Sequence, residues 1–137
     1  MEECVFCKIV QGKLPSTKLY EDKAVLSFLD IFPITKGHAL VIPKNHYRTI
    51  VDVPEKELGK VLETAKKIGA AQMKALGAKG FNILQSNEKE AGQVVFHAHF
   101  HVIPRKEGDG LGFRWPSKEA GKEELYKTQK IIKENLK

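Results

Sequence analysis

Residues 95–104 read Val-Phe-His-Ala-His-Phe-His-Val-Ile-Pro, a stretch in which three histidines stand at alternate positions, 97, 99 and 101. A β-strand points alternate side chains to opposite faces. We therefore predict a strand over Gln93–Pro104 that carries three histidines on one face, namely His97, His99 and His101. Its other face would be apolar and would bury against a helix; it holds Phe96, Ala98, Phe100 and Val102.

The rest of the chain predicts further short strands and two main helices. The strands are expected at Lys18–Glu21, Ala24–Leu29, His38–Pro43 and Phe81–Leu84, after a helical turn over 3–11. A long helix is expected over Glu55–Leu76, closed by Gly77, and Ser117 is expected to cap a C-terminal helix. Because the strands come in runs, the sequence favours an α+β fold: an antiparallel sheet of about five strands with one long central helix and a C-terminal helix.

Length and composition favour a single domain over residues 1–137, with 42% hydrophobic residues to form one core. There is no apolar run long enough to cross a bilayer, and the acidic start is unlike a signal peptide, so we expect a cytoplasmic protein with no membrane partner. The net charge is +6, and the basic residues are spread along the chain. This charge suits phosphorylated substrates. It forms no basic stripe with interleaved aromatic residues, so no nucleic acid polymer is expected as a partner.

Three histidines on one strand face are hard to explain structurally, because each buried imidazole would need its own hydrogen-bond partner. Two functions fit them. The histidines could bind a metal ion. Alternatively, one imidazole could attack phosphorus while its neighbours donate hydrogen bonds to the phosphate oxygens. Asn87, Gly92 and Gln93 lie just upstream and suit a polar, phosphate-holding pocket better than a closed metal cage.

Cys4 and Cys7 form a Cys-x-x-Cys pair near the start of the chain. In a cytosolic protein such a pair is more often metal-binding or redox-active than a structural disulfide. Two cysteines and two histidines together make a tetrahedral zinc set.

His97–Ile103 matches the His-φ-His-φ-His-φ-φ motif of the histidine triad family, where φ is an apolar residue, and the chain resembles that family in order over most of residues 4–116. The flanking matches include Gly92-Gln93, Phe28-Leu29-Asp30 and Gly37–Pro43. The resemblance implies a nucleotide hydrolase or nucleotidyl transferase that cleaves at the α-phosphate. His99 would be the nucleophile and would form a covalent nucleotidyl-histidine intermediate.

The resemblance also assigns roles around His99. His101, Gln93 and Asn87 would hold phosphate oxygens, with His101 and Gln93 counted among the catalytic residues. The base and ribose would be cradled by Phe28, Asp30, Ile31 and His38. The substrate would be a purine nucleotide derivative: a phosphoramidate, an acyl-adenylate or a dinucleoside polyphosphate. Val94 departs from the pattern, because many nucleoside phosphoramidases of the family carry Ser or Thr there.

A microbial subgroup of the family implies a structural zinc ion held by Cys4, Cys7, His46 and His97. The family further implies a homodimer formed through the central helix and the sheet edges, with Trp115 near the partner's active site. Two alternatives stay open. The chain could be a nucleotide-binding zinc protein with a regulatory role and vestigial catalysis, or a metalloenzyme whose zinc is held by the triad itself.

Overall fold

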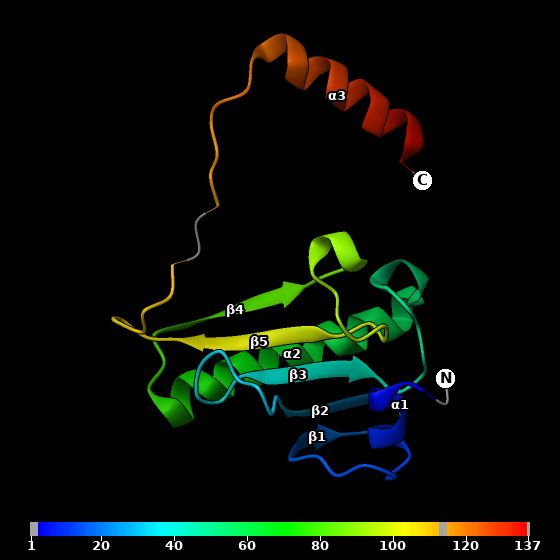
Figure 1. Ribbon diagram of the computed structural model, residues 1–137, viewed down its shortest axis with the longest axis vertical. Helices are drawn as coiled ribbons and strands as arrows, with labels where there is room; N and C mark the ends of the chain where they lie inside the picture. The colour runs from blue at the N-terminus through cyan, green and yellow to red at the C-terminus, as the bar shows by residue number, and fades with distance from the viewer. Residues whose placement is uncertain (1–2, 113–114, 137) are drawn as a thin grey trace.

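Five antiparallel strands form the central sheet of the computed structural model, which describes residues 3–112 and 115–136 (Figure 1). Their order across the sheet is β1-β2-β3-β5-β4. The strands are β1 (Lys18–Glu21), β2 (Val25–Leu29), β3 (Ala39–Pro43), β4 (Gly80–Gln85) and β5 (Phe100–Arg105). The helices are α1 (Val5–Val10), α2 (Glu55–Leu76) and α3 (Lys122–Asn135), with 3₁₀ turns η1 (Ile50–Asp52) and η2 (Lys89–Ala91). The predicted α+β class with its long central helix is confirmed.

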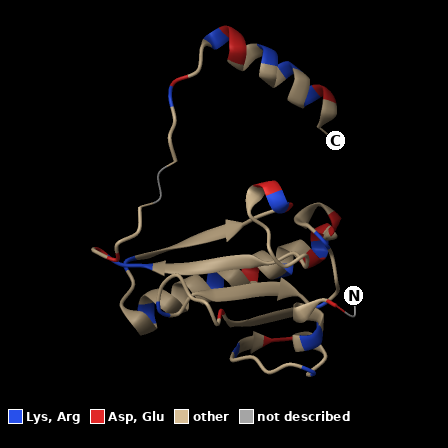
Figure 2. Ribbon diagram, in the orientation of Figure 1, with Lys and Arg blue, Asp and Glu red and all other residues tan. Residues whose placement is uncertain are grey.

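Helices pack on both faces of the central strands, α2 along one face and the short α1 on part of the other, and these strands are apolar on both sides. One face packs on α2 through Val25, Ala39, Val41, Phe100 and Val102. The other face packs on α1 through Leu26, Phe28, Leu40 and Ile42. Accordingly, β2 and β3 carry no charged residue (Figure 2). Since side chains alternate along β5, His101 lies on the α1 side, where it pairs in register with Leu40.

The predicted last strand is wrong over residues 93–99, because β5 begins only at Phe100. The end of β4 accounts for the late start, because Gln85, the last residue of β4, pairs with Phe100. On the other side Phe100 pairs with Val41, and β3 continues to Pro43 without a partner on β5. Residues 93–99 therefore lie outside the ladder and take their hydrogen bonds from elsewhere. The Ala98 N–H, for example, donates to the Tyr47 carbonyl at 2.7 Å.

The C-terminal end of α2 lies where the sequence predicted it, whereas the start of α3 does not. Gly77 closes α2 in the left-handed conformation, with φ 67°, as predicted. The expected cap at Ser117 is wrong, because α3 begins at Lys122 after Gly121 and has no side-chain cap. None of the helices in the described ranges is long and apolar enough to cross a membrane.

Two glycines of α2 give a matched test of this packing. A Cβ added at Gly69 would lie 2.4 Å from the Phe81 ring, whereas one added at Gly59 would meet nothing within 4 Å. We expect Gly69→Ala to destabilise the protein by about 1–3 kcal/mol, because the rigid ring has to move. Gly59→Ala should stabilise it by about 0.5–1 kcal/mol, since alanine favours an exposed helix position. Urea unfolding of both variants measures the difference, and equal effects would contradict the close approach of α2 to β4.

Candidate active site and candidate metal centre

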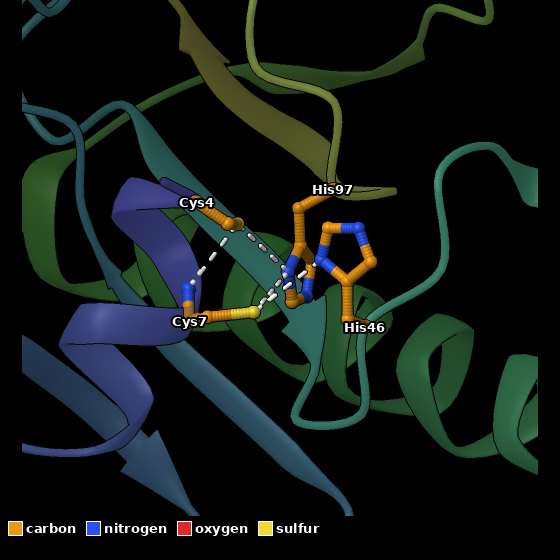
Figure 3. A group of neighbouring side chains, drawn as sticks. All are labelled: Cys4, Cys7, His46 and His97. Carbon is orange, nitrogen blue, oxygen red and sulfur yellow. Dashed lines mark hydrogen bonds between the residues drawn. The ribbon is translucent and has the colours of Figure 1, made fainter. Parts of the chain in front are cut away.

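Two cysteines and two histidines from three separate segments converge beside the start of β5 (Figure 3). Their ligand atoms all lie within 4.8 Å of one another. The Cys4 Sγ lies 3.4 Å from Nδ1 of His97, and the Cys7 Sγ lies 3.3 Å from Nδ1 of His46 and 3.6 Å from Nδ1 of His97. Helix α1 supplies both sulfurs, because Cys4 caps its start and Cys7 follows one turn later.

This cluster has the dimensions of a tetrahedral zinc site. With Zn–S bonds of about 2.3 Å and Zn–N bonds of about 2.0–2.1 Å, tetrahedral angles separate sulfur from nitrogen by roughly 3.5 Å. The three observed separations, 3.3–3.6 Å, bracket that value. The ring of His97 is also held from behind, because Nε2 lies 2.8 Å from the Pro43 carbonyl and donates to it. Metal-binding histidines commonly have such an outer partner, which leaves Nδ1 free as a ligand.

The electrostatics of the cluster also suit a cation. Burial lowers the pKa of His97 to about 4, so its ring is neutral at physiological pH, as a metal ligand must be. Burial also raises the pKa of the Cys7 thiol to about 11, and the neighbouring Cys4 adds to this shift. A divalent cation would displace the thiol protons and compensate the thiolates. The four residues therefore fit zinc in donor type, separation and charge.

The backbone fixes the orientation of the His99 ring. Its Nδ1 lies 2.6 Å from the carbonyl oxygen of His97 and donates to it, so Nε2 carries the lone pair. Burial lowers the pKa of His99, and this effect exceeds the opposing effects of that carbonyl and of the Asp30 carboxylate. The ring is thus held neutral, with an unprotonated Nε2.

A second chain of hydrogen bonds fixes the tautomer of His101. The backbone N–H of Ile34 donates to Nδ1 of His38 at 3.1 Å, so the proton of that ring sits on Nε2. Nε2 of His38 in turn lies 2.9 Å from Nδ1 of His101, which must accept. His101 therefore carries its proton on Nε2. Burial lowers its pKa to about 4, with further lowering by His99 and His38.

This chain also bears on the cluster of Asp30, His38 and His101, whose ligand atoms lie close enough for a metal ion. A cation there would need the Nε2 lone pair of His38, which requires the proton on Nδ1. Nδ1 already accepts from the Ile34 N–H. The cluster is thus better described as a proton-ordered hydrogen-bond chain than as a metal site.

The residues predicted to cradle base and ribose have different surroundings. Phe28 is buried, with its ring 5.5 Å from that of Phe6, whereas Ile31 is 82% exposed. Asp30 accepts from the Phe32 N–H, and its other oxygen lies 3.6 Å from Nε2 of His38. His38 itself is only 2% exposed, so it contacts His101 rather than the surface.

Asn87 and Gln93, predicted to hold phosphate, brace the loop between β4 and β5. The amide of Gln93 accepts from the Glu88 N–H and donates to the carbonyls of Arg48 and Val95. Asn87 accepts from the Ile50 N–H. The brace holds Glu88 at φ 72° and ψ 160°, a conformation otherwise almost confined to glycine and one that is often found at functional sites.

Phe6, which lies between the two cysteines, is a residue of the site that was not predicted from the sequence. Its ring stands edge-on to His99 at 5.1 Å and to His97 at 5.9 Å, measured between ring centroids. It therefore packs against the candidate metal centre and the candidate nucleophile at once. Its place inside the Cys-x-x-Cys pair is the one signal in the sequence that could have drawn attention to it.

Val94 and Trp115, the two other residues singled out in the sequence, are both exposed, at 84% and 79%.

Comparisons with known proteins bear on this site. A family model of the HIT domain matches residues 11–108. The chain is 41% identical to an adenosine 5'-monophosphoramidase of Candida albicans over 138 residues, which cover 97% of this chain and 91% of that protein. It is 47% identical to an adenylylsulfatase of Arabidopsis thaliana over 109 residues, which cover 80% of this chain and 55% of that protein.

Solved structures are similar as well. A crystal structure from Streptococcus mutans superposes with a TM-score of 0.95 at 42% identity, covering 100% of this chain and 87% of that one. A zinc-bound histidine triad family protein from Mycobacterium smegmatis superposes with a TM-score of 0.78, also at 42% identity, covering 85% of each chain.

The partly buried ring of His101 predicts acid sensitivity. Its pKa is about 4 in the folded chain and about 6.5 when unfolded, so between these values the unfolded state binds the extra proton. Stability should therefore fall as the pH drops from about 6.5 to about 4. His101→Gln keeps an acceptor for His38 and removes the titration, so it should lose less stability between pH 7 and pH 4.5, by on the order of 2 kcal/mol. Urea unfolding at both pH values tests this, and equal losses in variant and parent would contradict it.

Proposed function

The chain belongs to the histidine triad family, and on that premise we propose that it is a hydrolase or nucleotidyl transferase that cleaves purine nucleotide derivatives at the α-phosphate. One observation carries the proposal. In the described part of the chain, the triad nitrogens without a hydrogen-bond partner are Nε2 of His99 and Nε2 of His101. The first holds a lone pair and the second a proton, on rings whose centroids are 5.0 Å apart.

This pair of nitrogens suits phosphoryl chemistry in two steps. Nε2 of His99 attacks the α-phosphorus, and the bond to the leaving group breaks with its electrons departing on that group. Nε2–H of His101 donates to a phosphate oxygen as charge develops. The His97 carbonyl and the Asp30 carboxylate favour the positive charge that His99 gains. Water then displaces His99 and releases the nucleoside monophosphate.

The relatives support the class of bond that is broken. One is an adenosine 5'-monophosphoramidase, which cleaves a phosphorus–nitrogen bond, and another is an adenylylsulfatase, which cleaves an anhydride. In the substrate that each name implies, the leaving group is bonded to the phosphorus of an adenylyl group. We propose the same bond classes for this chain, with Phe28, Asp30 and Ile31 at the base and ribose.

Asn87 and Gln93 are proposed to act on phosphate through the loop that they brace. Their side-chain amides are already bound to the backbone of this loop at Glu88 and to the backbone of Arg48 and Ile50, so a direct contact with phosphate would compete with those bonds. Val94 follows Gln93 and offers no hydroxyl to the leaving group.

We propose that Cys4, Cys7, His46 and His97 hold one structural zinc ion. The zinc-bound relative supports this assignment, as does the fit of the four donors. Bound zinc would supply a fixed positive centre that ties α1 to the segments around His46 and His97. The His97 carbonyl orients the ring of His99, so the proposed metal centre would hold the proposed nucleophile in position without contacting the substrate.

We also propose that residues 1–137 work as one histidine triad domain within a cytoplasmic homodimer. The open edge of β4, whose outer side has no paired strand among the described residues, supports pairing with a second copy. Trp115 is proposed to lie near the partner's site.

Replacing the nucleophile tests the reaction. His99→Ala should fold and bind nucleotide, but its turnover should fall by about four orders of magnitude or more, as the loss of a covalent nucleophile commonly does. His101→Ala should cost less, about 2–4 kcal/mol of transition-state stabilisation, because it removes one donor. The measurement is release of nucleoside monophosphate from adenosine phosphoramidate and adenylylsulfate.

Quenching the wild type in alkaline denaturant, in which a phosphorus–nitrogen bond to histidine survives, should trap labelled nucleotide on His99, and phosphorus should keep its configuration after two displacements. Near-normal turnover in His99→Ala, or inversion at phosphorus, would favour direct attack by water. Tight nucleotide binding without turnover in the wild type would favour a regulatory binding protein instead.

Metal removal tests the zinc assignment. The protein purified without chelators should contain one zinc per chain, and a strong chelator should lower its melting temperature. Cys7→Ser should lose both metal and stability, whereas turnover per folded molecule should change less. Elemental analysis and thermal melting measure these effects. A metal-free protein whose melting temperature does not respond to added zinc would rule the assignment out.

A further inference from the structure

Gln72 is a buried polar residue of α2 whose side-chain hydrogen bonds leave the helix. Its side chain is 6% exposed. Nε2 carries two hydrogens, and it donates to the Gly37 carbonyl at 3.0 Å and to the Val102 carbonyl at 2.9 Å. Oε1 is buried and has no hydrogen-bond partner among the described residues. Both carbonyls require the nitrogen side of the amide, so the orientation of the amide is fixed even though its oxygen stays unpaired.

The bridge made by this amide lies where the ladder between β3 and β5 stops. The ladder ends at the pair of Ala39 with Val102. The same register would place Gly37 opposite Pro104, which has no N–H to donate. Gly37 also approaches α2 closely, because a Cβ on it would lie 2.4 Å from Cδ1 of Leu76, and its φ is 92°. The glycine thus brings its carbonyl within reach of α2, and the amide joins the two segments beyond the end of the ladder.

Each bridged carbonyl belongs to a residue next to a histidine of the candidate active site. Gly37 precedes His38, and Val102 follows His101. The side chain of Val102 packs on the α2 side of the sheet, whereas His101 lies on the α1 side, so Gln72 acts from the opposite face. Nε2 of His38 and Nδ1 of His101 lie 2.9 Å apart. This distance depends on where the two bridged backbones lie.

We propose that Gln72 is a positioning residue: by joining the backbones beside His38 and His101, it holds the two rings within hydrogen-bond distance and so keeps the proton of His101 on Nε2. Without the bridge, the ring of His101 is free to carry its proton on Nδ1, and Nε2 then has no hydrogen to donate to phosphate. The proposal rests on the donor role of His101 proposed above, but not on a covalent intermediate at His99.

The position of the ring protons tests the bridge without any substrate. Nitrogen NMR of the full-length protein as purified, with isotope-labelled histidine, separates protonated from unprotonated ring nitrogens. In the wild type at neutral pH, we expect His101 to be protonated on Nε2 alone. Gln72→Met removes both donors and nearly keeps the side-chain volume, so it should shift both nitrogen signals of His101 toward those of mixed tautomers. A wild-type His101 protonated on Nδ1, or unchanged signals in folded Gln72→Met, would overturn the proposal.

Thr64 offers a matched control on the same helix. It is also a buried polar residue, at 7% exposure, but its Oγ1 donates to the Lys60 carbonyl within α2. Thr64→Val should lower stability in urea and leave the histidine signals and kcat unchanged. Gln72→Met should lower kcat about tenfold to a hundredfold, because small displacements of a reacting group have effects of that size. KM should change less than about twofold, since the Thr35 hydroxyl still ties the loop between β2 and β3 to β5. Equal losses of kcat in the two variants would contradict a positioning role.

A double variant separates positioning from a general loss of structure. If Gln72 acts through His101, Gln72→Met should lower kcat less than about twofold in a His101→Ala background. An undiminished loss in that background would refute the proposal. If Gln72→Met does not fold, Gln72→Asn gives the same comparisons, because it keeps the amide but is a methylene too short to reach both carbonyls. A wild type that turns over no nucleotide would count against the proposed reaction, and the NMR comparison would still decide the bridge.

Discussion

The site depends on one residue, His97, which makes three directed contacts. Its Nδ1 faces the two sulfurs, its Nε2 donates to the Pro43 carbonyl, and its own carbonyl accepts from His99. Because it is fully buried and lies outside the strand ladder, these contacts replace the hydrogen bonds that a strand would have made. The side chain of His97 thus belongs to the candidate metal centre and its backbone belongs to the candidate active site.

Backbone groups determine where the protons lie in the histidine cluster. The Ile34 N–H sets the tautomer of His38, which sets that of His101, and the His97 carbonyl sets that of His99. Backbone groups do not titrate, so these assignments do not change with pH while the rings stay neutral. Burial lowers the pKa of His38, His99 and His101, which keeps the rings neutral and avoids their mutual repulsion.

The sequence predicted what depends on periodicity and motif spacing, and it missed what depends on partners distant in the chain. Alternation placed the sheet and its apolar face. The Cys-x-x-Cys pair indicated a metal centre, and the structure brings His46 and His97 to this pair as further candidate ligands. The boundary of β5 could not be read locally, because it coincides with the end of β4, whose last residue, Gln85, pairs with Phe100. The pairing of His38 with His101 spans 63 residues and could not be read from the sequence. The family resemblance placed His38 near base and ribose, and that role stays a prediction.

The irregular segment 93–99 lets one motif contribute to both the candidate metal centre and the candidate active site. In a regular strand, the three histidines would stand in one row, and their backbone groups would be used up by neighbouring strands. Release from the ladder frees the His97 carbonyl to accept from the ring of His99, two residues later. It also allows the rings of His97 and His46 to meet the sulfurs of α1. His101 remains within β5, where the ladder holds its ring beside that of His99. The strand therefore fixes the position of the proposed donor, His101, and the loop held by His97 fixes that of the proposed nucleophile, His99.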